Sequence, residues 1–191
     1  MPSPDLPRLD DEERRLLIDV AWASIRHGLA SGVPSPVVPR DYPPRLREPG
    51  AAFVTLHARG ALRGCIGHIE PDMPLYRAIA RSAVNAATDP RFVWEPIRPD
   101  ELKDLDLEVS VLTPPRPVPG PEDIVLGRHG IIIEKNGTGA TFLPKVATEQ
   151  GWTREETLRH LCRKAGLGPD DWKSGMKFSV YEAIVFGRAR K

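Results

Sequence analysis

Proline is the feature that most constrains how this chain can fold. Of its 21 prolines, 17 lie in four segments: Met1–Pro7, Val33–Pro49, Pro90–Pro99 and Thr113–Pro121. Proline has no amide hydrogen and clashes with the preceding helical turn, so none of these segments can be a helix interior. They are predicted to be connections, with the helices and strands lying between them. At 191 residues the chain is long enough to bury a core without disulfides or metals.

Between the proline segments, the spacing of apolar residues predicts both helices and strands. A capping box at Asp10 and Glu13 and apolar residues at helical spacing predict a helix over 11–30. A second helix, capped by Asp72, is expected to run to about Thr88, and shorter ones to lie near 99–102 and after a capping box at Thr153 and Glu156. Strands are predicted at Ala52–Ala58, Leu62–His68, Leu105–Leu112, Gly130–Glu134, Ala140–Leu143 and Lys177–Phe186.

The order of these elements indicates the fold class. Helices and strands are intermixed without a steady strand–helix–strand rhythm, and Asn136–Gly139 is a hairpin sequence. We therefore predict an α+β fold with a mixed, mainly antiparallel sheet and flanking helices.

Composition excludes several classes of protein. The net charge of +1 is too balanced for a protein that binds phosphate backbones, so nucleic-acid binding is the least favoured function. No apolar stretch approaches the roughly 20 residues that span a bilayer, and the N-terminus does not resemble a signal peptide. Cys65 and Cys162 form no disulfide framework, and the histidines show no metal spacing. We expect a cytoplasmic protein without a membrane partner, metal or cofactor.

The segment Leu62–Gly67, which reads LRGCIG, is the most unusual local sequence. Its two glycines bracket a cysteine and allow close approach of a ligand or of other backbone. If strand alternation holds, Arg63 and Cys65 share a face, and a guanidinium beside a thiol favours the thiolate. His68 and Glu70 then follow as a base or as hydrogen-bond acceptors. The alternative is that Cys65 is a small buried residue and the glycines serve a turn.

LRGCIG resembles the hallmark of the AMMECR-type domain family, also called AmmeMemoRadiSam system protein A. The resemblance continues, in the family's order, through Gly50–Leu56, Asp89–Phe92, Glu101–Leu102, Glu108–Leu112, Gly130–Ile131, Thr141–Pro144 and Glu149–Trp152. It implies one AMMECR-type domain over residues 10–191, with a larger and a smaller lobe, after an N-terminal tail at 1–9. This chain departs from the family pattern at His68, where a small polar residue is expected, and at Trp94, where proline is more usual.

The family has no firmly established activity. Its name reflects association with a Memo-type protein, which has a metal-dioxygenase-like fold, and with a radical SAM enzyme. The resemblance therefore implies a role in an uncharacterised modification pathway beside these two proteins.

Two functions remain open, with different residues at their centre. The first is a binding or adaptor module for a partner protein or an unknown small ligand, and we favour it because no complete catalytic constellation is visible. The second is an enzyme that uses Cys65 as nucleophile or thiol acceptor. Candidate catalytic residues are Cys65, Arg63 and His68, and candidate ligand-binding residues are Gly64, Gly67, Glu70, Arg91, Glu108 and Thr141.

Three of these candidates also have a plain structural explanation. Arg91 pairs either with Glu108 or Asp89 as a structural bridge, or with an anionic ligand. Glu108 on the polar face of a strand is commonly just an exposed charge, and the hydroxyl of Thr141 is commonly bonded locally.

Overall fold

The computed structural model describes residues 8–31 and 42–188, which divide into two compact units. The N-terminal unit comprises residues 8–31, 42–112 and 184–188, and the central unit comprises residues 113–183. Each unit has its own four-stranded sheet and its own hydrophobic core. The described strand pairings are antiparallel, which confirms the α+β prediction.

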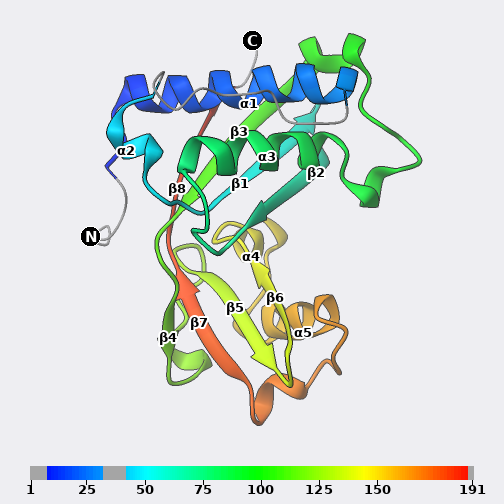
Figure 1. Ribbon diagram of the computed structural model, residues 1–191. Helices are drawn as coiled ribbons and strands as arrows, with labels where there is room; N and C mark the ends of the chain where they lie inside the picture. The colour runs from blue at the N-terminus through cyan, green and yellow to red at the C-terminus, as the bar shows by residue number, and fades with distance from the viewer. Residues whose placement is uncertain (1–7, 32–41, 189–191) are drawn as a thin grey trace. The chain divides into compact units, whose positions relative to one another are not determined.

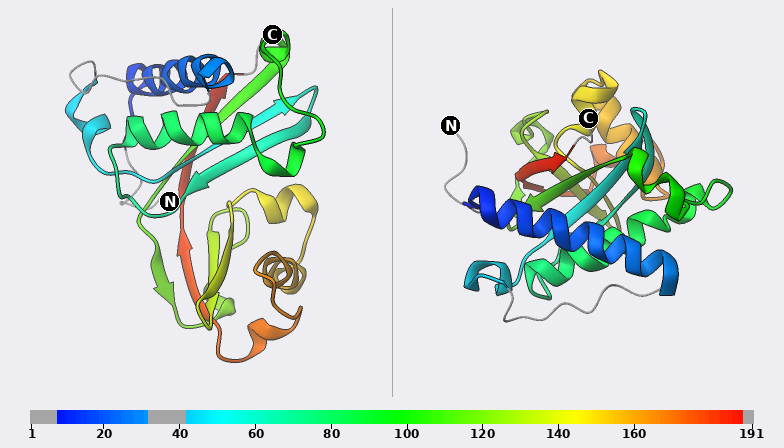
Figure 2. Two further views of the ribbon diagram at one scale, coloured as in Figure 1. Left: turned by 45° about the vertical axis from the view of Figure 1, so that its right-hand side comes forward. Right: turned by 90° about the horizontal axis from the view of Figure 1, so that it is seen from above.

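The N-terminal unit packs two long helices on one face of its sheet (Figures 1 and 2). The sheet has the strand order β2-β1-β3-β8. Leu17 and Ile25 of α1 and Ile79 of α3 are fully buried against the apolar side chains of the sheet. The elements are α1 (Asp11–Ser31), α2 (Pro44–Arg47), β1 (Ala52–Ala58), β2 (Ala61–His68), α3 (Leu75–Ala87), η2 (Pro90–Phe92), η3 (Pro99–Asp104), β3 (Leu105–Leu112) and β8 (Ala183–Arg188).

Local sequence explains where several of these elements begin and turn. The predicted capping box is present, because Asp10 Oδ1 accepts from the Glu13 amide at 2.8 Å and Glu13 Oε2 accepts from the Asp10 amide at 3.0 Å. Arg59 and Gly60 make the tight β1–β2 turn with positive φ angles of 51° and 79°. Residues 1–7 of the expected tail lie outside the described residues, whereas Leu9 is buried in the core.

The prediction that Asp72 caps a helix is wrong. Helix α3 begins after Pro74, which occupies the N-cap position, and no side chain caps the helix there. Asp72 lies two residues further out, with Oδ1 3.6 Å from Nε2 of His68. Proline at this position sets the entry angle of the chain and needs no side-chain acceptor.

The central unit has the strand order β4-β7-β5-β6 around a second core that includes Ile131, Ile133 and Phe178. Asn136 and Gly137 form the predicted hairpin turn, with φ angles of 54° and 77°. The elements are β4 (Arg116–Val118), η4 (Pro121–Asp123), β5 (Gly130–Lys135), β6 (Thr138–Phe142), α4 (Val146–Gln150), α5 (Arg154–Lys164), η5 (Asp171–Lys173) and β7 (Lys177–Tyr181).

The single strand predicted over Lys177–Phe186 is wrong. The segment is two strands, β7 and β8, which belong to different sheets and are separated at Glu182. There the Glu182 amide donates to Thr113 Oγ1 at 2.9 Å, and the Glu182 carbonyl oxygen accepts from the Thr113 amide at 2.9 Å. Among the described residues, none of the helices has the length and apolarity needed to cross a membrane.

Candidate functional site

The first glycine of LRGCIG allows strand β2 to touch the end of helix α3. A Cβ atom placed on Gly64 would lie 1.9 Å from the carbonyl oxygen of Ala86. That oxygen is backbone, so it has little freedom to move away from a larger side chain. Glycine at this position is therefore required by packing within the N-terminal unit.

Directly after α3, the carboxylate of Asp89 holds the next residue of β2. Its side chain is completely buried, and Oδ2 accepts a hydrogen bond from the Cys65 amide at 3.0 Å. Its Oδ1 accepts from the amide of Arg91 at 3.0 Å, and the guanidinium of Arg91 donates to both oxygens, at 2.6 Å for the shortest contact. Arg91 also donates to the carbonyl oxygen of Cys65 at 3.1 Å. Asp89 and Arg91 thus bind both backbone polar groups of Cys65.

The charges of this pair stabilise each other. Burial alone would raise the pKa of Asp89, but the hydrogen bonds from Arg91 and from the Cys65 amide outweigh it and hold the pKa below its usual value. The hydrogen bonds to Asp89 raise the pKa of Arg91. Both groups are therefore charged at neutral pH, as an ion pair that positions β2.

Arg63 is directed toward the segment after η2. The pairing of β1 with β2 shifts register between Leu56 and His57, and this shift leaves Arg63 without a paired residue. Its guanidinium donates to the carbonyl oxygen of Glu95 at 3.0 Å and lies 3.6 Å from Oε1 of Glu101. Alternation does not hold at the register shift, and the buried Arg63 serves to hold residues 95–101 against β2.

Cys65 lies on the sheet face that points away from α1 and α3. Its Sγ accepts a hydrogen bond from Thr55 Oγ1 at 3.3 Å, and the thiol is half-buried. Strand register pairs Thr55 with Cys65 on one side and with Glu108 on the other. Val54 and Leu56, the neighbours of Thr55 in β1, point into the core, so Thr55 faces the other way.

A thiol, a hydroxyl and a carboxylate consequently form one row across three adjacent strands. We call Cys65, Thr55 and Glu108 the sheet row. Side chains paired in this way across antiparallel strands have Cβ atoms roughly 5 Å apart. Thr55 is 3% exposed, whereas Cys65 and Glu108 on either side of it are half-buried.

The other candidates near LRGCIG lie elsewhere. Register pairs His68 with the core residue Ala52, which places His68 on the opposite face of β2 from Cys65. Glu70 is exposed in the loop that follows. A Cβ on Gly67 would lie 2.3 Å from the carbonyl oxygen of Ala52 and 2.4 Å from the ring of Phe53, so this glycine leaves room for the adjacent strand.

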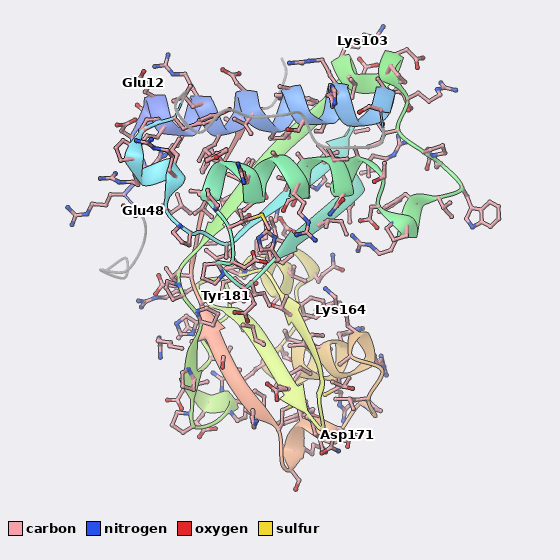
Figure 3. The ribbon with its side chains drawn as sticks, in the orientation of Figure 1. Glu12, Glu48, Lys103, Lys164, Asp171 and Tyr181 are labelled. Carbon is pink, nitrogen blue, oxygen red and sulfur yellow. The ribbon has the colours of Figure 1, made fainter. Side chains whose placement is uncertain are left out.

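Thr141 belongs to the central unit. Its Oγ1 donates to the carbonyl oxygen of Ile131 at 2.8 Å and lies 3.0 Å from the hydroxyl of Tyr181. Lys164 donates to its backbone carbonyl at 2.9 Å; Tyr181 and Lys164 are labelled in Figure 3. These contacts give the Thr141 side chain and backbone local roles.

Sequence reasoning misses two residues of this site. The role of Asp89 could have been predicted, since an aspartate before proline at a helix end commonly accepts local hydrogen bonds. The sequence pattern is interpreted only as a helix stop or as a partner of Arg91. Thr55 has no such signal, because its pairing with Cys65 is set by strand register. Across residues 8–31 and 42–188, no cluster of three or more His, Cys, Asp or Glu side chains suitable for a metal ion is present.

Comparison with known proteins agrees with this architecture. A model of the AMMECR1 family matches residues 18–186. A protein from Methanothermobacter thermautotrophicus is 46% identical over 169 residues, which cover 85% of this chain and 86% of that protein. A protein from Thermococcus gammatolerans is 44% identical over 177 residues, covering 86% and 84% of the two chains. The crystal structure of an uncharacterized protein from Pyrococcus horikoshii matches with a TM-score of 0.86 at 38% identity, covering 94% of this chain and 93% of that one.

Proposed function

Because the chain belongs to the AMMECR1 family, we propose that it is a binding or adaptor component of a modification pathway, acting beside a Memo-type protein and a radical SAM enzyme. Its ligand, a small molecule or a side chain of a partner protein, binds at the sheet row of Cys65, Thr55 and Glu108. The family resemblance supports the choice of pathway, and the geometry of the N-terminal unit supports the mode of action.

The observation that carries the proposal is that the polar side chains around LRGCIG form hydrogen bonds with backbone groups. Asp89 and Arg91 bind the amide and carbonyl of Cys65, and Arg63 binds the carbonyl of Glu95. A catalytic thiol is commonly activated by a general base within hydrogen-bond reach. The described partner of the Cys65 sulfur is instead the hydroxyl of Thr55, which is a donor. Such a fixed surface suits binding.

Glu108 is the group expected to select the ligand, because Thr55 is 3% exposed. Because the Thr55 hydroxyl donates its hydrogen to Cys65, the row offers a ligand acceptor oxygens, which suit an amine, amide or hydroxyl donor. The sulfur adds a soft, polarizable contact and no required chemistry. Replacement of Cys65 by serine is therefore tolerated, whereas loss of the Glu108 charge is not.

The test measures binding of the full-length protein to purified Memo-type and radical SAM proteins from the same genome, by calorimetry. Glu108→Gln is expected to weaken the complex by at least about tenfold, as for loss of one charge-assisted hydrogen bond. Cys65→Ser should bind within about threefold of the wild type, since the hydroxyl replaces the thiol as an acceptor. Glu12→Gln on the exposed side of α1 is the matched control.

Two outcomes would overturn the proposal. One is that neither protein binds the wild type. The other is that Glu108→Gln binds as well as Glu12→Gln does. Arg63→Ala provides a second variant, which releases Glu95 and is expected to weaken the complex through the shape of the site.

The alternative function is an enzyme that uses Cys65 as nucleophile or thiol acceptor, and it is favoured by the exposure of part of the thiol. It predicts that Cys65 is alkylated by iodoacetamide faster than glutathione at neutral pH. Cys162 is no suitable reference, because it is fully buried and burial raises its pKa. Slow alkylation together with an intact complex in Cys65→Ser would exclude this alternative.

A further inference from the structure

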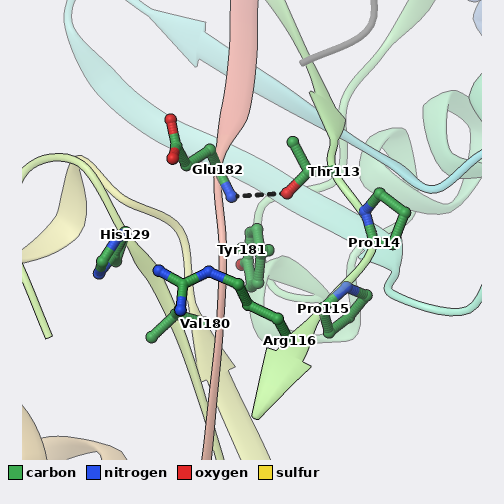
Figure 4. Close-up of a pocket in the computed structure, with 8 residues that line it drawn as sticks. All are labelled: Thr113, Pro114, Pro115, Arg116, His129, Val180, Tyr181 and Glu182. Carbon is green, nitrogen blue, oxygen red and sulfur yellow. Dashed lines mark hydrogen bonds between the residues drawn. The ribbon is translucent and has the colours of Figure 1, made fainter. Parts of the chain in front are cut away.

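The central unit contains a cavity of about 430 Å³ that is lined by residues of this unit. Its lining comes from the β4 region, from His129 just before β5 and from the end of β7 (Figure 4). Pro114, Pro115 and the ring of Tyr181 give it apolar walls, and Arg116 and His129 give it polar ones. Cavities of this size with a few convergent polar groups are typical of small-molecule sites.

Arg116 supplies a positive charge to this cavity. Figure 4 shows its guanidinium extended toward His129. Within the part of the chain that the structure describes, no hydrogen bond or ion pair engages this guanidinium. An arginine offers a planar pair of donors that matches a carboxylate.

The other charged groups at the cavity balance one another. Arg128 donates to Oε1 of Glu182 at 2.9 and 3.1 Å, so this pair is neutral as a unit. His129 accepts the Val125 amide at Nδ1, which places its hydrogen on Nε2. Burial, followed by the charges of Arg116 and Arg128, lowers the pKa of His129, while Glu182 opposes this effect. One uncompensated positive charge, that of Arg116, remains.

A buried hydroxyl adds a second donor, for which the described residues 8–31 and 42–188 provide no hydrogen-bond acceptor. Thr113 is 5% exposed, and its Oγ1 accepts from the Glu182 amide. This bond occupies a lone pair and leaves the hydroxyl hydrogen to be donated. In Figure 4 the hydroxyl lies at the wall of the cavity beside the dashed bond to Glu182.

We propose that the cavity binds a small organic monocarboxylate, whose carboxylate pairs with Arg116 and whose apolar body lies against Pro114, Pro115 and Tyr181. A single net positive charge matches a monoanion. A phosphate dianion would bring a second negative charge close to Glu182, which has its own partner already. The site lies wholly in the central unit, so the inference does not depend on the sheet row.

The test follows the imidazole signals of His129 by NMR in the full-length protein, with the His129→Gln variant used to identify them. Benzoate is the probe, and benzamide is its neutral counterpart of the same shape. Benzoate is expected to shift the His129 signals in a saturable way. Benzamide should bind at least about tenfold more weakly than benzoate, because benzamide lacks the charge-assisted hydrogen bonds to Arg116. Arg116→Gln should weaken benzoate by a similar factor, while Arg163→Gln, an exposed arginine on α5, should not.

Each contrary outcome overturns the inference. If benzoate does not saturate at millimolar concentration, the cavity is not a carboxylate site. If inorganic phosphate binds more tightly than benzoate at equal ionic strength, the ligand class is wrong. If Arg116→Gln binds benzoate as the wild type does, the cavity is not where benzoate binds.

Discussion

Replacement of Gly64 by alanine tests the close approach on which the LRGCIG site depends. The added Cβ would lie 1.9 Å from the Ala86 carbonyl oxygen, whereas real Cβ atoms essentially never come within 3.0 Å, so strand and helix end must separate by at least the difference, 1.1 Å. If the helix end carries Asp89 with it, the Cys65 amide, now 3.0 Å from Oδ2, moves out of hydrogen-bond range.

The expected cost is the sum of two effects. Overpacking between fixed backbone segments costs about 1–3 kcal/mol. Loss of a hydrogen bond to a buried carboxylate adds about 1.5–3 kcal/mol. We therefore expect Gly64→Ala to lower the free energy of unfolding by about 2.5–6 kcal/mol, measured by urea denaturation. Hydrogen exchange should also accelerate in the peptide that spans residues 61–68.

Gly60→Ala is the matched control in the same hairpin. Gly60 has a φ angle of 79°, and a Cβ added to it would have no atom within 4 Å, so only backbone strain of about 1–2 kcal/mol is expected. If Gly64→Ala destabilises the protein no more than Gly60→Ala does, the strand and helix are not in the contact described, and the account of the site fails.

Three further predictions concern charge and exposure. Asp89→Asn should lower the free energy of unfolding by about 2 kcal/mol at neutral pH. Because the folded pKa of Asp89 is lowered, the wild type should lose this stability as pH falls below 3.8 through the folded value. An equal slope of unfolding free energy against pH in the variant would contradict this prediction. The folded pKa of His129 is also lowered, so stability should fall as pH drops below 6.5, and His129→Gln should remove this part of the urea-denaturation pH profile. Trp94 is 95% exposed, so Trp94→Ala should change the free energy of unfolding by less than about 0.5 kcal/mol; a larger loss would mean that the side chain packs against the protein.

Local signals in the sequence predict the elements well. The bounds of β1 and the two hairpin turns follow from alternation and from residues that tolerate positive φ, as at Gly60 and Gly137. The capping boxes at Asp10 and Thr153 also depend on residues three positions apart, so sequence alone reveals them.

What the sequence could not predict depends on partners far away along the chain. In Lys177–Phe186 the charged residue Glu182 interrupts the apolar alternation, but one such residue does not show that the two halves pair with different sheets. The sheet row likewise joins Cys65 to Thr55 and Glu108 through register alone. Strand alternation predicts Arg63 beside Cys65, but the register shift in β2 turns its side chain toward Glu95.

The hydrogen bonds of Asp89 and Arg91 with the backbone of Cys65 have a consequence for self-association of the protein. Strand β2 lies at the edge of its sheet, where unpaired amides and carbonyls invite another chain to add a strand. At Cys65 both groups are already taken, by a carboxylate and a guanidinium of the same chain. The charged pair therefore also hinders aggregation through this edge. A chain without the pair would expose an unpaired amide and carbonyl at the centre of LRGCIG, to which another strand could bind.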